Sequence, residues 1–266
     1  MIEPWLWLAW AWGAAAVVFA GVWGVCHKIK NAGYVDVAWA FSIGVGVIVA
    51  AMMFRDGTGR PLFVALMGAA WAFRLAWHLW SRLHGKEEDG RYAHMREAFG
   101  DRAPLAFFVF FQMQALFVVL FLAPMVSAMT IGGAIGWREI VAAVIWMVAM
   151  RGEVAADNQL AKFKADPDNK GKVCKEGLWR YSRHPNYFFE WLHWFAYLVI
   201  GARLSESIGY AALAGPVVMG LFLLFVTGIP YTEKRAIKSK GDAYKQYQRE
   251  TSAFIPWFPK NAEQGN

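Results

Sequence analysis

Residues 105–129 read LAFFVFFQMQALFVVLFLAPMVSAM, and no charged side chain interrupts this stretch. About 20 largely apolar residues are enough for a helix to cross roughly 30 Å of hydrocarbon. Comparable apolar stretches lie on both sides of it, at residues 5–26, 35–54, 62–82, 137–156, 186–202 and 207–229. The sequence therefore predicts an all-α integral membrane protein, in which seven transmembrane helices form one bundle and one domain over residues 1–266.

The composition also fits a membrane protein, because 58% of the 266 residues are hydrophobic and 15 Trp and 20 Phe are present. Several aromatic residues lie near predicted span ends, where rings favour the headgroup zone: Trp5, Trp7, Trp137 and Trp257. The first span has no basic segment before it and no small-residue cleavage site after it, so we expect it to remain in the mature protein. The two cysteines, Cys26 and Cys174, predict neither a disulfide framework nor a metal site.

The positions of lysine and arginine predict the orientation. Most cations lie in segments on one predicted side, at residues 28–30, 82–102, 162–183 and 234–260, whereas the other side carries Arg55, Arg60, Arg138 and Arg203. Cytoplasmic loops are enriched in Lys and Arg, which predicts an outside N-terminus and a cytoplasmic C-terminus in a bacterial inner membrane. The net charge of +7 borders spans, where membrane lipids account for it, so we exclude nucleic acid as a partner. No obligate protein partner is indicated.

The most informative polar run is GLWRYSRHPNYFFEW, residues 177–191, which lies where an apolar stretch begins. Pro185 suits the first turn of a helix, whose free backbone donors and positive dipole end attract anions, with Arg180, Arg183 and His184 beside them. Asn186 and Glu190 are four residues apart and share a helix face, so an amide and a carboxylate are available to bind a carboxamide. The alternative is an interfacial cap whose cations meet lipid phosphate.

The tail predicts a short helix from Glu233 to Lys240 that ends before Gly241, followed by a second turn through Tyr244 and Tyr247. A basic amphipathic helix on anionic lipid would explain the lysines equally well. Surface attraction does not need a tyrosine or a glutamate, so Tyr231, Glu233, Tyr244 and Tyr247 remain candidate binding residues.

A second group of candidates lies in the N-terminal half. Asn31, Tyr34, Asp36 and Trp39 bracket the start of the second predicted span, where a carboxylate is costly and indicates function. Arg74, His78 and Arg82 recur every four residues and share one helix face, although a single intramembrane histidine is often only a packing residue. Gln112 and Gln114 point to different faces of their helix, and Gln114 is favoured as the one that faces a cavity. The charged segment 87–92, EEDGRY, is either a binding loop or a solvated run of charges.

Together, the run 177–191 and the ending Phe254-Ile255-Pro256 resemble the C-terminal signature of the steroid 5-alpha-reductase family and its bacterial relatives. Sterol C14 reductases and isoprenylcysteine carboxyl methyltransferases share a weaker form. The resemblance is strongest from Glu153 to Pro256, and segment 87–92 resembles a loop common in the bacterial members. It implies a seven-helix bundle whose later helices and cytoplasmic loops, residues 153–258, cover NADPH while a lipid cavity holds the substrate.

Carried over position by position, the resemblance implies that Asn186 and Glu190 contact the cofactor, together with Asp157 on the preceding helix. Lys164 and Lys172 stand where the family has arginines for the phosphates, which keeps the charge but loses bidentate geometry. No Gly-x-Gly-x-x-Gly motif indicates a Rossmann site, and the cations Lys164, Lys172, Arg180 and Arg183 favour NADPH over NADH. The full set of expected cofactor residues is Asp157, Lys164, Lys172, Arg180, Tyr181, Arg183, His184, Asn186, Tyr187, Glu190, Arg82, Arg91, Tyr92, Tyr231, Glu233, Tyr244 and Tyr247.

The implied substrate is a 3-oxo-4-ene steroid or a related lipid enone from the bilayer. Hydride addition to its β carbon generates an enolate, which needs a hydrogen-bond donor near the carbonyl oxygen. Asp36 aligns with the family's carboxylate, but the family's tyrosine falls near Trp71, so Tyr34 or His78 is expected to substitute for it. Trp39, Trp71 and Gln114 are expected to line the substrate cavity.

Two other functions fit parts of the sequence. An S-adenosylmethionine-dependent methyltransferase of the isoprenylcysteine type has a similar late helix and tail but needs fewer phosphate-binding cations. A transporter or lipid-binding protein would use Asp36, Arg74 and Glu190 as a polar path, but no repeat symmetry is visible and the polar groups gather at one end.

Overall fold

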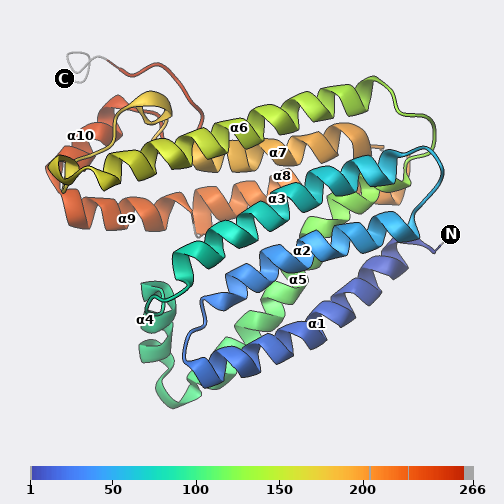
Figure 1. Ribbon diagram of the computed structural model, residues 1–266, viewed down its shortest axis with the longest axis horizontal. Coiled ribbons are helices and arrows are strands. Elements are labelled where there is room, and N and C mark those ends of the chain that lie inside the picture. Colours follow the sequence, from blue (N-terminus) through green and yellow to red (C-terminus); the bar gives the residue numbers. More distant parts are fainter. Residues whose placement is uncertain (1, 204, 227, 261–266) are drawn as a thin grey trace. The chain divides into compact units, whose positions relative to one another are not determined.

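The computed structural model describes residues 2–203, 205–226 and 228–260, and all of its regular elements are helical (Figure 1). The α-helices are α1 (Pro4–Ile29), α2 (Tyr34–Met53), α3 (Arg60–Leu83), α4 (Gly90–Phe99), α5 (Ala103–Thr130), α6 (Trp137–Ala165), α7 (Pro185–Gly201), α8 (Ala214–Leu221), α9 (Ile229–Lys240) and α10 (Asp242–Glu250). The expectation of an all-helical fold is confirmed for the described residues. The first residue and the last six of the predicted domain lie outside them.

Among the described residues, five helical runs are long and apolar enough to cross a membrane, namely Pro4–Ile29, Tyr34–Met53, Arg60–Leu83, Gly90–Thr130 and Ser207–Lys240. This agrees with a multi-pass membrane protein. The apolar helix α7 is shorter, at 17 residues, and α6 carries several charged side chains along its 29 residues.

One predicted span is interrupted in the structure. Residues 207–229 were expected to form a single helix, but a 3₁₀ helix (Ser207–Leu213) is followed by α8 and then by a π-helical segment (Phe222–Val226). Pro216 lies in the first turn of α8, a position that proline favours because its missing N–H has no partner there. The proline therefore favours a new helix start. Residue 227, inside the predicted span, lies outside the described residues.

The described residues form two compact units, the first from 2–136 and 200–215 and the second from 137–199 and 216–260. In the first unit α2 packs against both α3 and α5. A Cβ atom added at Gly44 would lie 2.7 Å from the Phe73 ring of α3, and one at Gly46 would lie 2.7 Å from Leu122 of α5. Small residues permit this close approach of helices, so the two glycines let side chains from both neighbours pack directly on α2.

In the first unit a buried arginine binds the segment that follows α5. Arg60, at the start of α3, is only 4% exposed. Its guanidinium donates to the carbonyl oxygens of Ile131, of Gly132 at 3.3 Å and of Ala134 at 2.9 Å. These carbonyls follow the C-terminal end of α5, where backbone acceptors have no partner within the helix. Arg60 therefore fixes the segment that leaves α5.

In the second unit α7 lies close to α6. A Cβ atom at Gly152 of α6 would lie 2.4 Å from the Phe189 ring of α7, which explains the glycine at this position. Trp179, in the 3₁₀ turn Gly177–Arg180, donates from Nε1 to the Ala156 carbonyl oxygen of α6 at 2.9 Å. The backbone N–H of Leu178 donates to Gln159 Oε1, also at 2.9 Å. The segment that leads into α7 is thus fixed on α6.

Candidate functional site

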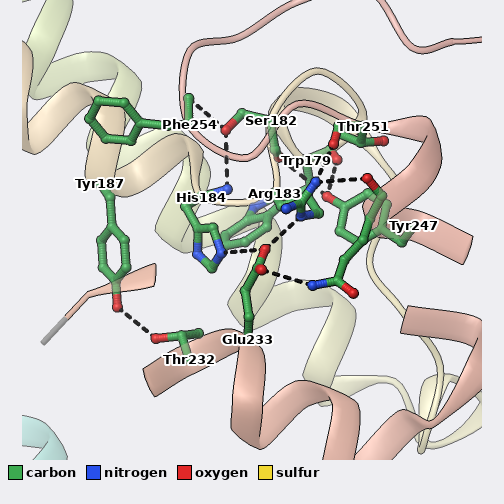
Figure 2. A network of polar contacts seen from close by, with 11 residues as sticks. Trp179, Ser182, Arg183, His184, Tyr187, Thr232, Glu233, Tyr247, Thr251 and Phe254 are labelled. Carbon is green, nitrogen blue, oxygen red and sulfur yellow. Dashed lines mark hydrogen bonds and ion pairs between the residues drawn. The ribbon is translucent and has the colours of Figure 1, made fainter. Parts of the chain in front are cut away.

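The Arg183 side chain is the centre of a buried polar network in the second unit (Figure 2). Its Nε donates to Glu233 Oε1 of α9 at 2.6 Å, and its Nη1 donates to the Gln248 carbonyl oxygen of α10 at 3.0 Å and to the Thr251 carbonyl oxygen. Its backbone N–H donates to the Ser252 carbonyl oxygen at 2.8 Å. The guanidinium that was expected to meet a cofactor phosphate therefore binds groups of the protein itself.

The carboxylate of Glu233 is shared among three partners. Besides Arg183, it accepts from Gln248 Nε2 at 2.8 Å, and His184 Nε2 lies 3.4 Å from Oε1. The His184 ring stacks on Tyr187 with ring centroids 5.3 Å apart, and the Tyr187 hydroxyl lies 3.1 Å from Thr232 Oγ1. α9 is thereby connected to the start of α7 through four residues that the sequence proposed as cofactor ligands.

Two tyrosines of α10 complete the network. The hydroxyl of Tyr247 donates to the carbonyl oxygens of Trp179 and Ser182, so it anchors α10 on the loop before α7. Burial raises the pKa of Tyr247, and it raises the pKa of Tyr244 to about 12. Both side chains are therefore neutral at physiological pH and able to donate hydrogen bonds.

Asn186 and Asp157, both proposed as cofactor residues, are brought into contact. Asn186 Nδ2 of α7 donates to Asp157 Oδ1 of α6 at 3.2 Å. Glu190 follows one helical turn after Asn186 on the same helix. The close approach of α6 and α7 at Gly152 makes this pairing possible. An amide held by one carboxylate, with a second carboxylate one turn away, is able to recognise a group that both donates and accepts hydrogen bonds.

The other proposed cations of the second unit are exposed. Among the described residues, no carboxylate lies within ion-pair distance of the Lys164, Lys172 or Arg180 side chains, so their charge is available to an anion. Tyr181 packs against Phe258 with ring centroids 6.1 Å apart, and the Tyr231 ring lies 5.7 Å from the guanidinium carbon of Arg235.

In the first unit Asp36 binds the first turn of α4. Its Oδ1 accepts from the buried Tyr92 hydroxyl at 2.9 Å, and its Oδ2 accepts from Arg91 Nη2 at 3.2 Å. Arg91 also contacts Asp89 through Nε at 3.1 Å. The proposed catalytic carboxylate is therefore fixed by two residues that were proposed as cofactor ligands.

The charged segment 87–92 makes specific hydrogen bonds and ion pairs with its neighbours in the first unit. Glu88 accepts from Arg96 Nη2 at 2.8 Å and, through the same Oε1, from the Ala32 backbone N–H at 2.8 Å. Asp89 caps α4 by accepting from the Arg91 backbone N–H at 2.9 Å. These contacts show an ordered segment that holds Asp36 and the turn before α2, so residues 87–92 are not simply a solvated run of charges.

A cavity of about 300 Å³ lies beside Asp36. Residues of α2, α3, α4, the α3–α4 loop and the turn before α2 line this cavity. They are Gly33, Asp36, Leu79, Arg82, Leu83, Lys86, Glu87, Asp89, Arg91 and Tyr92. Within the described part of the chain, no hydrogen bond or ion pair involves the side chains of Arg82 and Lys86. The cavity therefore offers two cations to a ligand, whereas the Arg91 charge is already balanced by carboxylates.

Three of the remaining candidates of the first unit, Tyr34, Trp39 and Trp71, make aromatic contacts. The Tyr34 ring lies 5.6 Å from Trp80, and the proposed substrate residues Trp39 and Trp71 meet edge to face at 6.3 Å. The positions of His78 and Gln114 are both half-buried. Gln112, by contrast, donates to the Ala16 carbonyl oxygen of α1 at 3.3 Å.

Sequence reasoning missed several members of these clusters. Ser182 accepts from the His184 backbone N–H at 3.1 Å and donates to the Phe254 carbonyl oxygen at 2.8 Å, and Gln248 bonds Glu233. Lys86 lines the cavity beside Asp36. Ser182 lies inside the run 177–191, which was a usable signal, whereas nothing local distinguishes Gln248. No group of three or more His, Cys, Asp or Glu side chains within the described residues is placed to hold a metal ion.

Comparison with known proteins gives a family but no activity. The chain is 27% identical over 265 residues to an uncharacterized protein of Schizosaccharomyces pombe, C594.04c, with 88% of this chain and 75% of that protein covered. No solved structure matches the chain significantly. The family described as "Protein of unknown function (DUF1295)" matches residues 22–251, which is most of the chain. The chain therefore belongs to the DUF1295 family.

Proposed function

We propose that this protein is a seven-span membrane reductase that uses NADPH to reduce the carbon–carbon double bond of a 3-oxo-4-ene steroid or related lipid enone. The proposal includes an outside N-terminus and a cofactor-binding part, residues 153–258, that faces the cytoplasm. The observation that carries it is the hydrogen bond between Asn186 and Asp157, with Glu190 one turn along α7.

This arrangement fits a nicotinamide carboxamide. The hydrogen bond to Asp157 uses one N–H of the Asn186 amide, which leaves its other N–H and its oxygen for a ligand. The Glu190 carboxylate accepts from the carboxamide NH₂. The exposed side chains of Lys164 and Lys172 supply positive charge for the phosphates. When bound, the cofactor supplies the hydride, while these residues orient it.

The network around Arg183 has a different role in the proposal. Since Arg183, Glu233 and Gln248 bind one another, their side chains hold the loop before α7 in place. This fixes the start of α7, and with it the orientation of Asn186 and Glu190. Arg183, His184 and Tyr247 then act as positioning residues.

In the first unit Asp36 is proposed to polarise the substrate ketone as a protonated carboxyl group that donates a hydrogen bond, with Tyr34 or His78 as a further donor. The contacts of Asp36 with Tyr92 and Arg91 keep its carboxyl group in one orientation beside the cavity. Oriented donors near the carbonyl oxygen stabilise the developing enolate, and an acid then protonates the α carbon.

The test separates cofactor binding from turnover. Asn186→Ala and Glu190→Ala should abolish the rise in melting temperature that NADPH produces in the detergent-solubilised protein. Asp36→Ala should keep that rise but reduce NADPH oxidation with a panel of enones by about 100-fold or more. Gln112→Ala, whose amide contacts α1, is the matched control and should behave as the parent.

Stabilisation by S-adenosylmethionine and not by NADPH would overturn the reductase proposal in favour of a methyltransferase. Enone reduction by Asp36→Ala at the parent rate would show that the assigned acid is wrong, while leaving the cofactor site intact.

A further inference from the structure

The segment after α10 displays large apolar side chains. Ile255 is 57% exposed, Trp257 is 70% exposed and Phe258 is 75% exposed. Between and after them are Pro256 and Pro259, which restrict the backbone. Three neighbouring apolar side chains with this much exposure indicate an interaction surface. We refer to Ile255, Trp257 and Phe258 as the tail patch.

The tail patch is held rigidly. The backbone N–H of Trp257 donates to the Tyr181 carbonyl oxygen at 2.9 Å, and that of Lys260 donates to the Glu250 carbonyl oxygen at 2.8 Å. Phe254, just before the patch, is buried, and its carbonyl oxygen accepts from Ser182 Oγ. The exposure of the patch is therefore imposed by the fold.

The patch lies at the N-terminal end of an apolar helix. Phe254 packs against Phe188 and Trp191, in the first two turns of α7, with ring centroids 5.9 and 5.4 Å apart. α7 is an apolar-rich helix of 17 residues in all. In the proposed seven-span arrangement, the start of α7 lies where hydrocarbon gives way to headgroups.

Two cations are adjacent to the patch, one along the chain and one beside a residue that contacts it. Arg180 precedes Tyr181, which contacts Phe258, and Lys260 follows the patch by two residues. Both are exposed, and among the described residues neither side chain has an ion-paired carboxylate. Glu250, a nearby acid, is paired with Lys175 at 2.8 Å. The free charge beside the patch is therefore cationic, which complements anionic headgroups.

We propose that the tail patch inserts into the headgroup region of the bilayer, where Arg180 and Lys260 bind anionic lipid. Tryptophan and phenylalanine are well suited to this depth, and the adjacent cations meet the phosphates. The tail patch is then a membrane anchor that holds the C-terminal segment, and through Tyr181 and Ser182 the loop before α7. This inference does not depend on the cofactor that the protein binds.

The test uses a nitroxide label on a cysteine introduced by Phe258→Cys in the full-length protein in lipid nanodiscs. The native Cys26 and Cys174 are buried, so labelling is directed to the new site. Power saturation should show frequent collisions with oxygen and a loss of collisions with a water-soluble nickel chelate. The matched control, Ala243→Cys on the exposed surface of α10, should collide readily with the nickel chelate.

Two outcomes overturn the proposal. If the label at 258 is as accessible to nickel as the label at 243, the patch faces water. If the label at 258 is protected from both oxygen and nickel, protein covers it, either a partner or a second copy of this chain.

A second experiment changes the lipid composition to test whether Arg180 and Lys260 bind headgroups. In the Phe258→Cys background, nanodiscs with anionic lipid should give a deeper label position than zwitterionic ones. Arg180→Gln with Lys260→Gln should remove this difference while leaving the label in the zwitterionic bilayer unchanged. Retention of the full difference in the double variant would show that these cations do not bind the headgroups.

Discussion

Two arginine clusters, one in each unit, use the same side chain in different ways. The Arg183 guanidinium is 9% exposed and is enclosed by a carboxylate and backbone carbonyls, whereas the Arg91 side chain is 41% exposed and lies at a cavity. A buried charge must be paired because its desolvation is costly, but a half-exposed charge keeps part of its hydration. The Arg183 cluster therefore maintains the fold, whereas the Arg91 cluster keeps charged side chains at a cavity that a ligand can reach.

The largest effect is expected from Glu233→Ala, which leaves Arg183 buried without its carboxylate. Breaking a buried pair by removing one partner costs about 3–5 kcal/mol. The free energy of unfolding, measured by denaturant titration of the detergent-solubilised protein, should fall by this amount. Glu233→Gln keeps the side-chain shape and one acceptor oxygen and should lose less. An unchanged unfolding free energy in Glu233→Ala would show that the Arg183 cluster does not maintain the fold.

An intermediate effect is expected from Gly152→Ala, which acts on the helix approach in the second unit without changing any charge. The added methyl group meets the Phe189 ring, so overpacking should cost about 1–3 kcal/mol. Because α6 must move away from α7, the contact between Asp157 and Asn186 should weaken, and NADPH binding with it. Gly13→Ala in α1, where a Cβ atom meets no neighbour within 4 Å, is the control. Equal stability of the two variants would contradict the close approach.

The smallest effect is expected from Tyr92→Phe, which removes one hydrogen bond from Asp36 and keeps the ring. The loss should be about 1 kcal/mol, since Asp36 retains Arg91 as a partner. Unfolding of the purified variant would measure this, and turnover of an enone should fall more than stability does. A loss as large as that of Glu233→Ala would show that the first-unit cluster is also structural.

Much of the fold could be predicted from local signals. Pro185 begins α7 and Gly241 follows the end of α9, as the backbone preferences of these residues indicated. Apolar length identified the five helical runs of the described residues that are able to cross a membrane, but it also predicted spans at 137–156 and 186–202, which are not among these runs. It did not identify the interruption after residue 213, because hydropathy averages composition and gives no weight to Pro216.

The candidate site was harder to predict. The charge and position of Arg183 suggested a phosphate ligand, but its partners Glu233 and Gln248 lie 50 and 65 residues away in the chain. No local pattern shows such a pairing. The family resemblance named Asp157 and Asn186 as separate cofactor residues, and their contact with each other, which follows from the packing of α6 on α7, was not predicted.

The length of α5 has a consequence for its place in the bilayer. Its 28 residues extend for about 42 Å at 1.5 Å per residue, which exceeds the roughly 30 Å thickness of the hydrocarbon. A helix of this length either tilts or projects beyond the lipid. Arg60 supplies donors to three carbonyls that follow α5, so these acceptors need no water as partners. One guanidinium thus lowers the number of backbone acceptors that must be hydrated just beyond the end of a long helix.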